Sequence, residues 1–256
     1  MSDQLTLLGV GASAGTPVVG CECSTCQSTN KKNYRTRCSS LLTLKNGKNI
    51  LIDTSPDLRL QSLREGLTSV DAVLYTHHHA DHCHGIDDLR AFCQINKKQI
   101  PLYGNQFSID ELNKKFQYAM TEPNGFWEVP ILKPNVINEP IELFGQNINP
   151  IPVFHGRSLI NGYRLGDMAY LTDVSKIPDS SIEQLQNLDV LLLDCLRNEP
   201  HPTHLSVKES LEIASELKAK KTFLIHMTHD LEYDALSKIL PESIYVGYDG
   251  LKINVN

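Results

Sequence analysis

Hydrophobic residues fall in short runs along the chain, most of them four to seven residues long and rich in Leu, Ile, Val or Tyr. Runs of this kind, bounded by turn-forming residues, are typical of strands that are buried in a sheet. The pair Asp249-Gly250 favours a tight turn, so we expect Leu251–Val255 to form a hairpin with the strand before it. The other predicted strands are Gln4–Leu8, Ser40–Leu44, Asn49–Ile52, Ala72–Thr76, Ile148–Val153, Met168–Thr172, Asp189–Asp194, Lys221–His226 and Ile244–Tyr248.

Between these runs the apolar positions recur at helical spacing, which predicts amphipathic helices. The clearest is Ser206–Lys218, because Ser206 and Glu209 can form a capping box ahead of an apolar stripe. Strands and helices intermixed in this way predict an α/β fold with two sheets or one large mixed sheet, and helices outside. The other predicted helices are Asp57–Glu65, Ile86–Asn96, Ser108–Tyr118, Ile182–Asn187 and Leu231–Lys238.

The chain has 256 residues, and nothing in its composition marks a domain boundary, so we predict one domain over residues 1–256. Thr121–Pro140 is the longest segment that we expect to be irregular, either as a linker or as a loop over the active site. The formal net charge of −6 disfavours a nucleic-acid partner, which would require a basic face. No apolar run could span a membrane, and the first residues lack the features of a secretion signal, so we expect a cytoplasmic protein.

The ten histidines are clustered: none precedes residue 77, and five lie between His77 and His84. In an extended segment residues two apart face the same way, so His77 and His79 can converge on one point. If a helix then begins near Asp81, Asp81 and His82 lie in its first turn and can converge on a second point nearby. This arrangement predicts two divalent metal ions a few ångströms apart, as in metal-assisted hydrolysis.

Further candidate ligands lie at the ends of other predicted strands. His155, Asp173 and His226 each stand where an apolar run ends. Side chains at strand ends can meet at one edge of a sheet, so we expect these three to join the first histidine cluster.

Three of the seven cysteines, Cys21, Cys23 and Cys26, fall within six residues. In a reducing compartment such clustering suggests a metal rather than a disulfide. Three thiolates leave a tetrahedral zinc site one ligand short, and His229 is the attractive fourth, although it could instead be a capping or surface histidine. The remaining cysteines, expected to be small buried apolar residues, are Cys38, Cys83, Cys93 and Cys195.

The order of these candidate ligands resembles that of the metallo-β-lactamase superfamily of hydrolases. The matching pattern is His77-x-His79-x-Asp81-His82, followed by His155, Asp173 and His226, and Asp53 matches an early aspartate that supports the ligands. The resemblance implies an αββα sandwich with both metals at one edge. It also implies a hydroxide bridging the two metals as the nucleophile. The implied ligands are His77, His79 and His155 for one metal, and Asp81, His82 and His226 for the other, with Asp173 bridging both.

The Cys-x-Cys-x-x-Cys motif, together with His226 and His229, resembles the branch of this superfamily that contains phosphoribosyl cyclic phosphate phosphodiesterases. In that branch the three cysteines and the second histidine hold a structural zinc. His204 matches a histidine that assists the chemistry, a role suited to an imidazole that protonates the leaving oxygen. The resemblance thus implies His204 and Asp81 as catalytic residues, and it implies a homodimer.

We therefore predict a dinuclear metal-dependent phosphodiesterase that acts on a small phosphodiester, such as a cyclic ribose phosphate. The implied cofactors are two Mn²⁺ or Zn²⁺ ions in the active site and one structural Zn²⁺, since nitrogen and oxygen donors do not choose between these metals. The alternatives are hydrolysis of a carbon ester, lactone or thioester, and a non-hydrolytic relative in cofactor biosynthesis.

Overall fold

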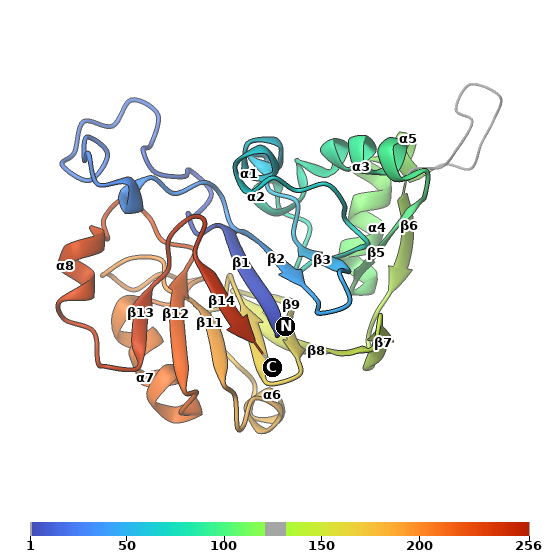
Figure 1. The fold of residues 1–256 in the computed structure, drawn as a ribbon. Helices are drawn as coiled ribbons and strands as arrows, with labels where there is room; N and C mark the ends of the chain where they lie inside the picture. The colour runs from blue at the N-terminus through green and yellow to red at the C-terminus, as the bar shows by residue number, and fades with distance from the viewer. Residues whose placement is uncertain (1, 121–131, 256) are drawn as a thin grey trace.

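The computed structural model describes residues 2–120 and 132–255, and all statements below concern that part of the chain. Two seven-stranded sheets lie against each other, with helices on their outer sides (Figure 1). This arrangement confirms the predicted α/β sandwich. None of the helices in the described ranges has the length and apolar content required to cross a bilayer.

The first sheet is antiparallel at one side, from β14 to β3, and parallel from β3 to β6. Its strands, in spatial order, are β14 (Lys252–Val255), β1 (Asp3–Gly9), β2 (Ser39–Thr43), β3 (Asn49–Ile52), β4 (Ala72–Leu74), β5 (Ile100–Gly104) and β6 (Leu132–Val136).

The second sheet is parallel from β13 to β10 and antiparallel from β10 to β7. Its strands, in spatial order, are β13 (Ile244–Val246), β12 (Lys221–Ile225), β11 (Val190–Asp194), β10 (Met168–Leu171), β9 (Ser158–Leu165), β8 (Gln146–His155) and β7 (Ile141–Leu143).

Most helices begin and end close to the predicted positions, but the helix predicted over Ile182–Asn187 lies three residues earlier, at Asp179–Gln184. The capping box of Ser206 and Glu209 at the start of α7 is confirmed. The helical elements are η1 (Lys31–Asn33), α1 (Leu58–Glu65), α2 (Ala80–Cys83), η2 (Ile86–Asp88), α3 (Leu89–Asn96), α4 (Gln106–Lys115), α5 (Gln117–Met120), α6 (Asp179–Gln184), α7 (Val207–Leu217) and α8 (Tyr233–Ser237).

Successive side chains of a strand point to opposite faces of the sheet, and this alternation divides the hydrophobic core into two clusters. In β3, Ile50 and Ile52 belong to the large cluster that includes residues of both sheets. Leu51, one position along, belongs to the cluster that includes α1 and α3. The two-residue period of a strand produces this division, and each fully buried side chain contributes about 1.5–3 kcal/mol to folding.

The predicted hairpin at Asp249-Gly250 is wrong. The strands on either side of this turn belong to different sheets, since β13 pairs with β12 and β14 pairs with β1. A type I′ turn requires positive φ at both central residues, whereas here only Gly250 has it, at 86°. The carboxylate of Asp249 instead accepts hydrogen bonds from the amides of Val10 and Thr36, which fixes a crossing from one sheet to the other.

Four strands were not predicted: β5, β6, β7 and β9. The expectation of an irregular segment over Thr121–Pro140 is wrong for its second half, because Leu132–Val136 forms β6 and pairs with β5. Pro134 is tolerated there because β6 is the last strand of its sheet. Residues 121–131 lie outside the described residues.

Candidate metal centres

The ends of four strands bring most of the predicted ligands to one place, and α2 carries Asp81 and His82. His77 and His79 follow β4, His155 ends β8, and the turns after β10 and β12 carry Asp173 and His226. Both of these last residues have left-handed backbone, with φ of 58°, a conformation that residues other than glycine adopt rarely. Such strained positions concentrate at functional sites.

The first group consists of His77, His79 and His155, whose candidate ligand atoms lie within 4.8 Å of one another. The His77 ring centre is 4.5 Å from that of His79 and 5.4 Å from that of His155. His77 and His155 are buried, whereas His79 is exposed, so solvent reaches this group from the His79 side.

The second group consists of Asp81, His82, Asp173 and His226, again within 4.8 Å. Asp173 Oδ2 lies 3.1 Å from His82 Nε2 and 3.4 Å from His226 Nε2. Its other oxygen, Oδ1, lies 3.9 Å from Nε2 of His77 in the first group. Asp173 thus turns one oxygen toward each group, as a bridging carboxylate would.

The buried nitrogens of these groups fit a pair of metal ions. In the described part of the chain, Nε2 of His77, His82 and His226 has no hydrogen-bond partner. An unpaired buried polar atom costs free energy, and one ion in each group would together satisfy all three nitrogens. Imidazole and carboxylate donors suit zinc, manganese or iron.

Asp53 fixes the orientation of two histidines from different groups. Its Oδ2 lies 2.8 Å from His82 Nδ1 and accepts a 2.7 Å hydrogen bond from the Thr76 hydroxyl. The Thr76 oxygen in turn lies 3.0 Å from His77 Nδ1 and can accept its proton. With Nδ1 protonated in this way, each ring would bind a metal ion through Nε2, as supporting partners of metal ligands commonly ensure.

The charges of the site interact strongly. Burial alone would raise the pKa of Asp173, but His226 and His82 hold it well below its usual range. Burial lowers the pKa of His82, yet its carboxylate neighbours, Asp173 first, raise it well above the usual value. The pKa of His226 is raised in the same way, against burial, mainly by Asp173. Without metal, these shifts favour the ionised form of Asp173 and the protonated forms of His82 and His226.

His204 lies beside both groups and is held by Asp194, a buried residue at the end of β11. Asp194 Oδ1 is 3.3 Å from His204 Nδ1 and accepts the amide of Asp173 at 3.1 Å. His204 Nε2 lies 3.8 Å from Asp173 Oδ1. Sequence reasoning did not assign Asp194 a role, although its place after the buried run Val190–Leu193 was the same strand-end signal that pointed to the other ligands.

The loop that carries His204 also positions His155. The backbone carbonyl of Thr203 accepts a hydrogen bond from His155 Nδ1 at 2.9 Å, so Nε2 faces the first group. Gly156 permits this contact, because a Cβ there would lie 2.8 Å from Thr203 Cγ2.

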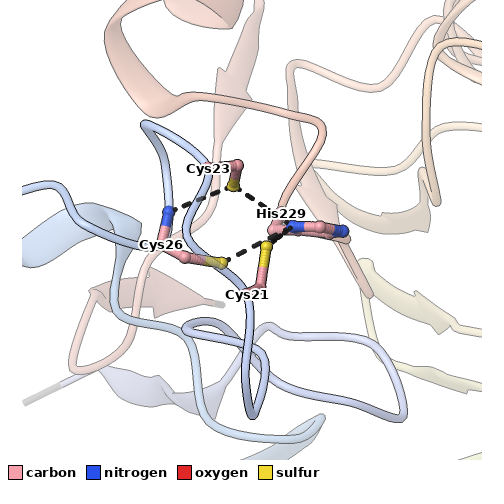
Figure 2. Close-up of side chains that lie close together, drawn as sticks. All are labelled: Cys21, Cys23, Cys26 and His229. Carbon is pink, nitrogen blue, oxygen red and sulfur yellow. Dashed lines mark hydrogen bonds between the residues drawn. The ribbon is translucent and has the colours of Figure 1, made fainter.

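The three clustered cysteines surround one nitrogen of His229 (Figure 2). The Sγ atoms of Cys21, Cys23 and Cys26 lie 3.3, 3.3 and 3.5 Å from His229 Nδ1. One N–H cannot serve three sulfurs, but ligands of a tetrahedral zinc lie about this far apart, given bonds of about 2.3 Å to sulfur and 2.0 Å to nitrogen. These four residues therefore fit a closed zinc site.

The thiols of this cysteine site differ in their environments. The amide of Cys26, followed by His229, lowers the pKa of Cys23 to about 6. Burial raises the pKa of Cys26 to about 11. A bound zinc ion would remove this difference in protonation, since it binds each cysteine as the thiolate.

The chain segment after the cysteine site is fastened to the loop after β12. The buried guanidinium of Arg35 donates to the carbonyls of Thr228 and Leu231. Arg37 instead forms an ion pair with Asp57 at 2.6 Å. Both arginines therefore have structural partners.

The comparisons with known proteins agree with this geometry. Residues 48–227 match the family model described as "Beta-lactamase superfamily domain". The chain therefore belongs to the β-lactamase superfamily. A solved structure described as a new diphosphatase from the PhnP family is 43% identical, with a TM-score of 0.93, over 99% of this chain and 98% of that one. Within the superfamily, the chain belongs to the PhnP family.

Two more distant structures bear on the fold alone. Zinc-bound PqqB from Methylobacterium extorquens is 19% identical, with a TM-score of 0.79, over 98% of this chain and all of that one. The short form of human tRNase Z is 16% identical, with a TM-score of 0.72, over 99% of each chain.

A curated relative carries a different name. The octanoyltransferase of Porphyromonas gingivalis is 38% identical over 251 residues, which are 96% of this chain. The chain spans about half the length of that relative, since the match covers 50% of it. The name of the whole relative does not by itself assign acyl transfer to the matched half.

Proposed function

We propose that this protein is a dinuclear metal-dependent phosphodiesterase that hydrolyses a small phosphodiester or a diphosphate. The observation that carries the proposal is the position of His204, held by Asp194 and facing Asp173 Oδ1 at 3.8 Å. A histidine supported by a carboxylate beside two groups of metal ligands suits proton transfer to a leaving oxygen. The PhnP-family diphosphatase supports the choice of substrate linkage.

We assign one set of residues to metal binding and another to proton transfer. His77, His79 and His155 would hold one ion, and Asp81, His82 and His226 the other, with Asp173 between them. When bound, two divalent ions polarise a phosphoryl oxygen and lower the pKa of a coordinated water, which provides a nucleophile at neutral pH.

His204 is the proposed general acid. Asp194 Oδ1 accepts the hydrogen bond of His204 Nδ1–H, which leaves Nε2 directed toward Asp173 and the metal groups. Histidine exchanges protons near neutral pH, so Nε2–H can protonate the departing oxygen and later regain its proton from solvent. Asp194 acts as a positioning residue, and Cys21, Cys23, Cys26 and His229 would hold a structural zinc.

The second candidate is hydrolysis of a carbon ester, lactone or thioester. The acyl-transfer name of the Porphyromonas gingivalis relative favours it, although the chain matches only half of that protein. The same pair of ions could polarise a carbonyl group, so the ligand geometry does not separate the two classes.

The deciding experiment removes the active-site metals and reloads the protein separately with Mn²⁺ and Zn²⁺. Substrates are a ribose 1,2-cyclic phosphate, a chromogenic phosphodiester and a dinucleoside diphosphate, compared with a lactone and a thioester. Circular dichroism before and after metal removal checks that the fold persists.

Metal-dependent turnover of the phosphate substrates, lost in His204→Ala, is the expected result. Turnover of the lactone or thioester alone would overturn the phosphodiesterase proposal and favour the acyl alternative. No turnover on any substrate would favour a non-hydrolytic role.

A further inference from the structure

An exposed apolar surface borders the open side of the first histidine group. Phe107 in the first turn of α4 is 58% exposed, and Leu159 near the start of β9 is 50% exposed. His78, between the candidate ligands His77 and His79, is half-buried beside them. We call Phe107, Leu159 and His78 the apolar ledge. Exposed apolar side chains that gather in one patch commonly mark a binding surface.

Specific contacts hold the ledge in shape. The rings of His78 and Phe107 meet at 5.0 Å and nearly at right angles, at 89°. Asn105 caps α4 by accepting the Ser108 amide at 2.8 Å, and its Nδ2 donates to the Leu159 carbonyl at 3.2 Å. These hydrogen bonds attach the start of α4 to β9, and they thereby hold the helical turn that carries Phe107 in place.

The ledge is continuous with the candidate metal ligands. The His78 ring centre is 5.2 Å from that of His79, the exposed member of the first group. Leu159 pairs with Phe154 across the hairpin whose first strand ends at His155. The ledge thus adjoins His79, the exposed ligand of the first group, on the side from which solvent reaches it.

The chemistry of the ledge selects a flat apolar group. Among the described residues, Phe107 has no ring contact besides His78, and an edge-to-face contact leaves a phenyl face available for stacking. Stacking of a nucleobase on an aromatic side chain is worth about 1–3 kcal/mol and does not depend on base identity. A bare sugar phosphate has no group that would gain from this surface.

We propose that the apolar ledge binds a flat ring of the substrate, of the nucleobase class, while the phosphate lies at the metal groups. This proposal rests on the proposed phosphodiesterase function and narrows its substrate to a nucleotide-like ester or diphosphate. Phe107 is then a specificity-determining residue that takes no part in bond cleavage.

The test compares two phosphates that differ in the ring. Binding of AMP and of ribose 5-phosphate to manganese-loaded protein is measured by calorimetry, for the wild type and for Phe107→Ala. Phe107→Trp tests rescue by another aromatic ring. Ile95→Ala, on α3 and 71% exposed, is the control for loss of an exposed apolar side chain elsewhere.

We expect wild-type protein to bind AMP more tightly than ribose 5-phosphate. Phe107→Ala should weaken AMP binding about 10-fold and leave ribose 5-phosphate unchanged, because about 1.4 kcal/mol of stacking corresponds to a factor of ten. Phe107→Trp and Ile95→Ala should bind AMP as the wild type does.

Three other outcomes would overturn the inference, and they can be told apart. Equal binding of AMP and ribose 5-phosphate by the wild type, or an unchanged AMP affinity in Phe107→Ala, would remove the ledge as a ring site and leave the phosphodiesterase proposal standing. Binding of neither phosphate would remove both proposals together.

Discussion

The two candidate metal centres share one loop but are built differently. His226 and His229, three residues apart after β12, belong to the buried histidine–aspartate cluster and to the cysteine site respectively. The buried cluster takes its ligands from strand ends and from α2, where partners such as Asp53 hold the rings in place. The cysteine site takes its thiols from a loop, where Cys21 and Cys23 are only partly buried.

This difference indicates which property each metal controls. Residues of the buried cluster are placed by both sheets, so we expect their arrangement to persist when metal is absent. The cysteine loop itself is largely exposed and irregular, and the contacts of Arg35 with the loop after β12 lie further along the chain, so we expect the metal to hold the thiols to His229. We therefore expect the first centre to determine turnover and the second to determine stability.

The sharpest test removes the carboxylate that faces both histidine groups. We expect Asp173→Asn to lower kcat about a thousandfold, roughly 4 kcal/mol, because charge stabilisation at both ions is lost. Turnover, metal content and circular dichroism are measured together. Asp167→Asn, with a 56% exposed side chain, is the matched control and should behave as the wild type. Wild-type turnover in Asp173→Asn would contradict the assignment of the site.

The next test separates proton transfer from metal binding within the buried cluster. His204→Ala should lower kcat about 10²–10⁴-fold, the usual contribution of general acid catalysis, with both metals retained. Asp194→Asn should lower kcat about 10–100-fold, since it only positions His204 and its neighbours. Kinetics and metal analysis of the same samples separate an effect on proton transfer from an effect on metal binding. Loss of both ions in His204→Ala would refute the role of His204 as an acid.

A substitution in the cysteine site should instead affect stability much more than turnover. Cys23→Ser should lower the free energy of unfolding by about 3 kcal/mol, or roughly 6–12 °C in Tm, because the zinc no longer holds the loop to His229. Turnover per folded molecule should change only a few-fold. Thermal unfolding with zinc analysis measures this, and Ser24→Ala in the same loop serves as the control. Loss of zinc with no change in Tm would break the proposed contrast.

A smaller and graded effect is expected from pH. The pKa values of His82 and His226 are raised in the metal-free site, so both carry protons at pH values below them. A metal must displace these protons, so affinity should rise with pH, by at most about tenfold per pH unit for each proton, and level off above the raised pKa values.

Calorimetry in two buffers of different ionisation enthalpy counts the protons released on binding. His78→Gln, whose ring belongs to neither ligand group, should release the same number. Affinity that does not change with pH would contradict the protonation of these histidines.

The sequence predicted those parts of the fold that carry a strong local signal. Strands such as Leu191–Leu193 within β11 are continuous apolar runs, and α7 has a capping box, so both were identified. β6 contains Pro134, and β9 contains Asn161-Gly162, so their local sequence disfavours a strand although pairing with neighbours produces one. The turn at Asp249 failed as a hairpin because its carboxylate binds Val10 and Thr36, far away in sequence.

The candidate ligands were identifiable because their residue types are chemically distinctive and occur at strand ends. The structure brings the predicted ligands together in three groups that match those implied by the resemblance, and their binding of metal remains a prediction. Asp194 was not assigned a role, although it also stands at a strand end, because it acts through the residues that it supports. Its three hydrogen-bonding neighbours become visible only after folding.

The cysteine site joins positions 208 residues apart, from Cys21 to His229, and this distance has a consequence during synthesis. A ribosome that adds about 5–20 residues per second needs on the order of 10–40 s to make the intervening chain. Throughout that time the three thiols have emerged but lack their fourth ligand. Nascent chains should therefore be open to oxidation or to the wrong metal at these thiols, and the supply of zinc to the translating cell should determine the yield of native protein.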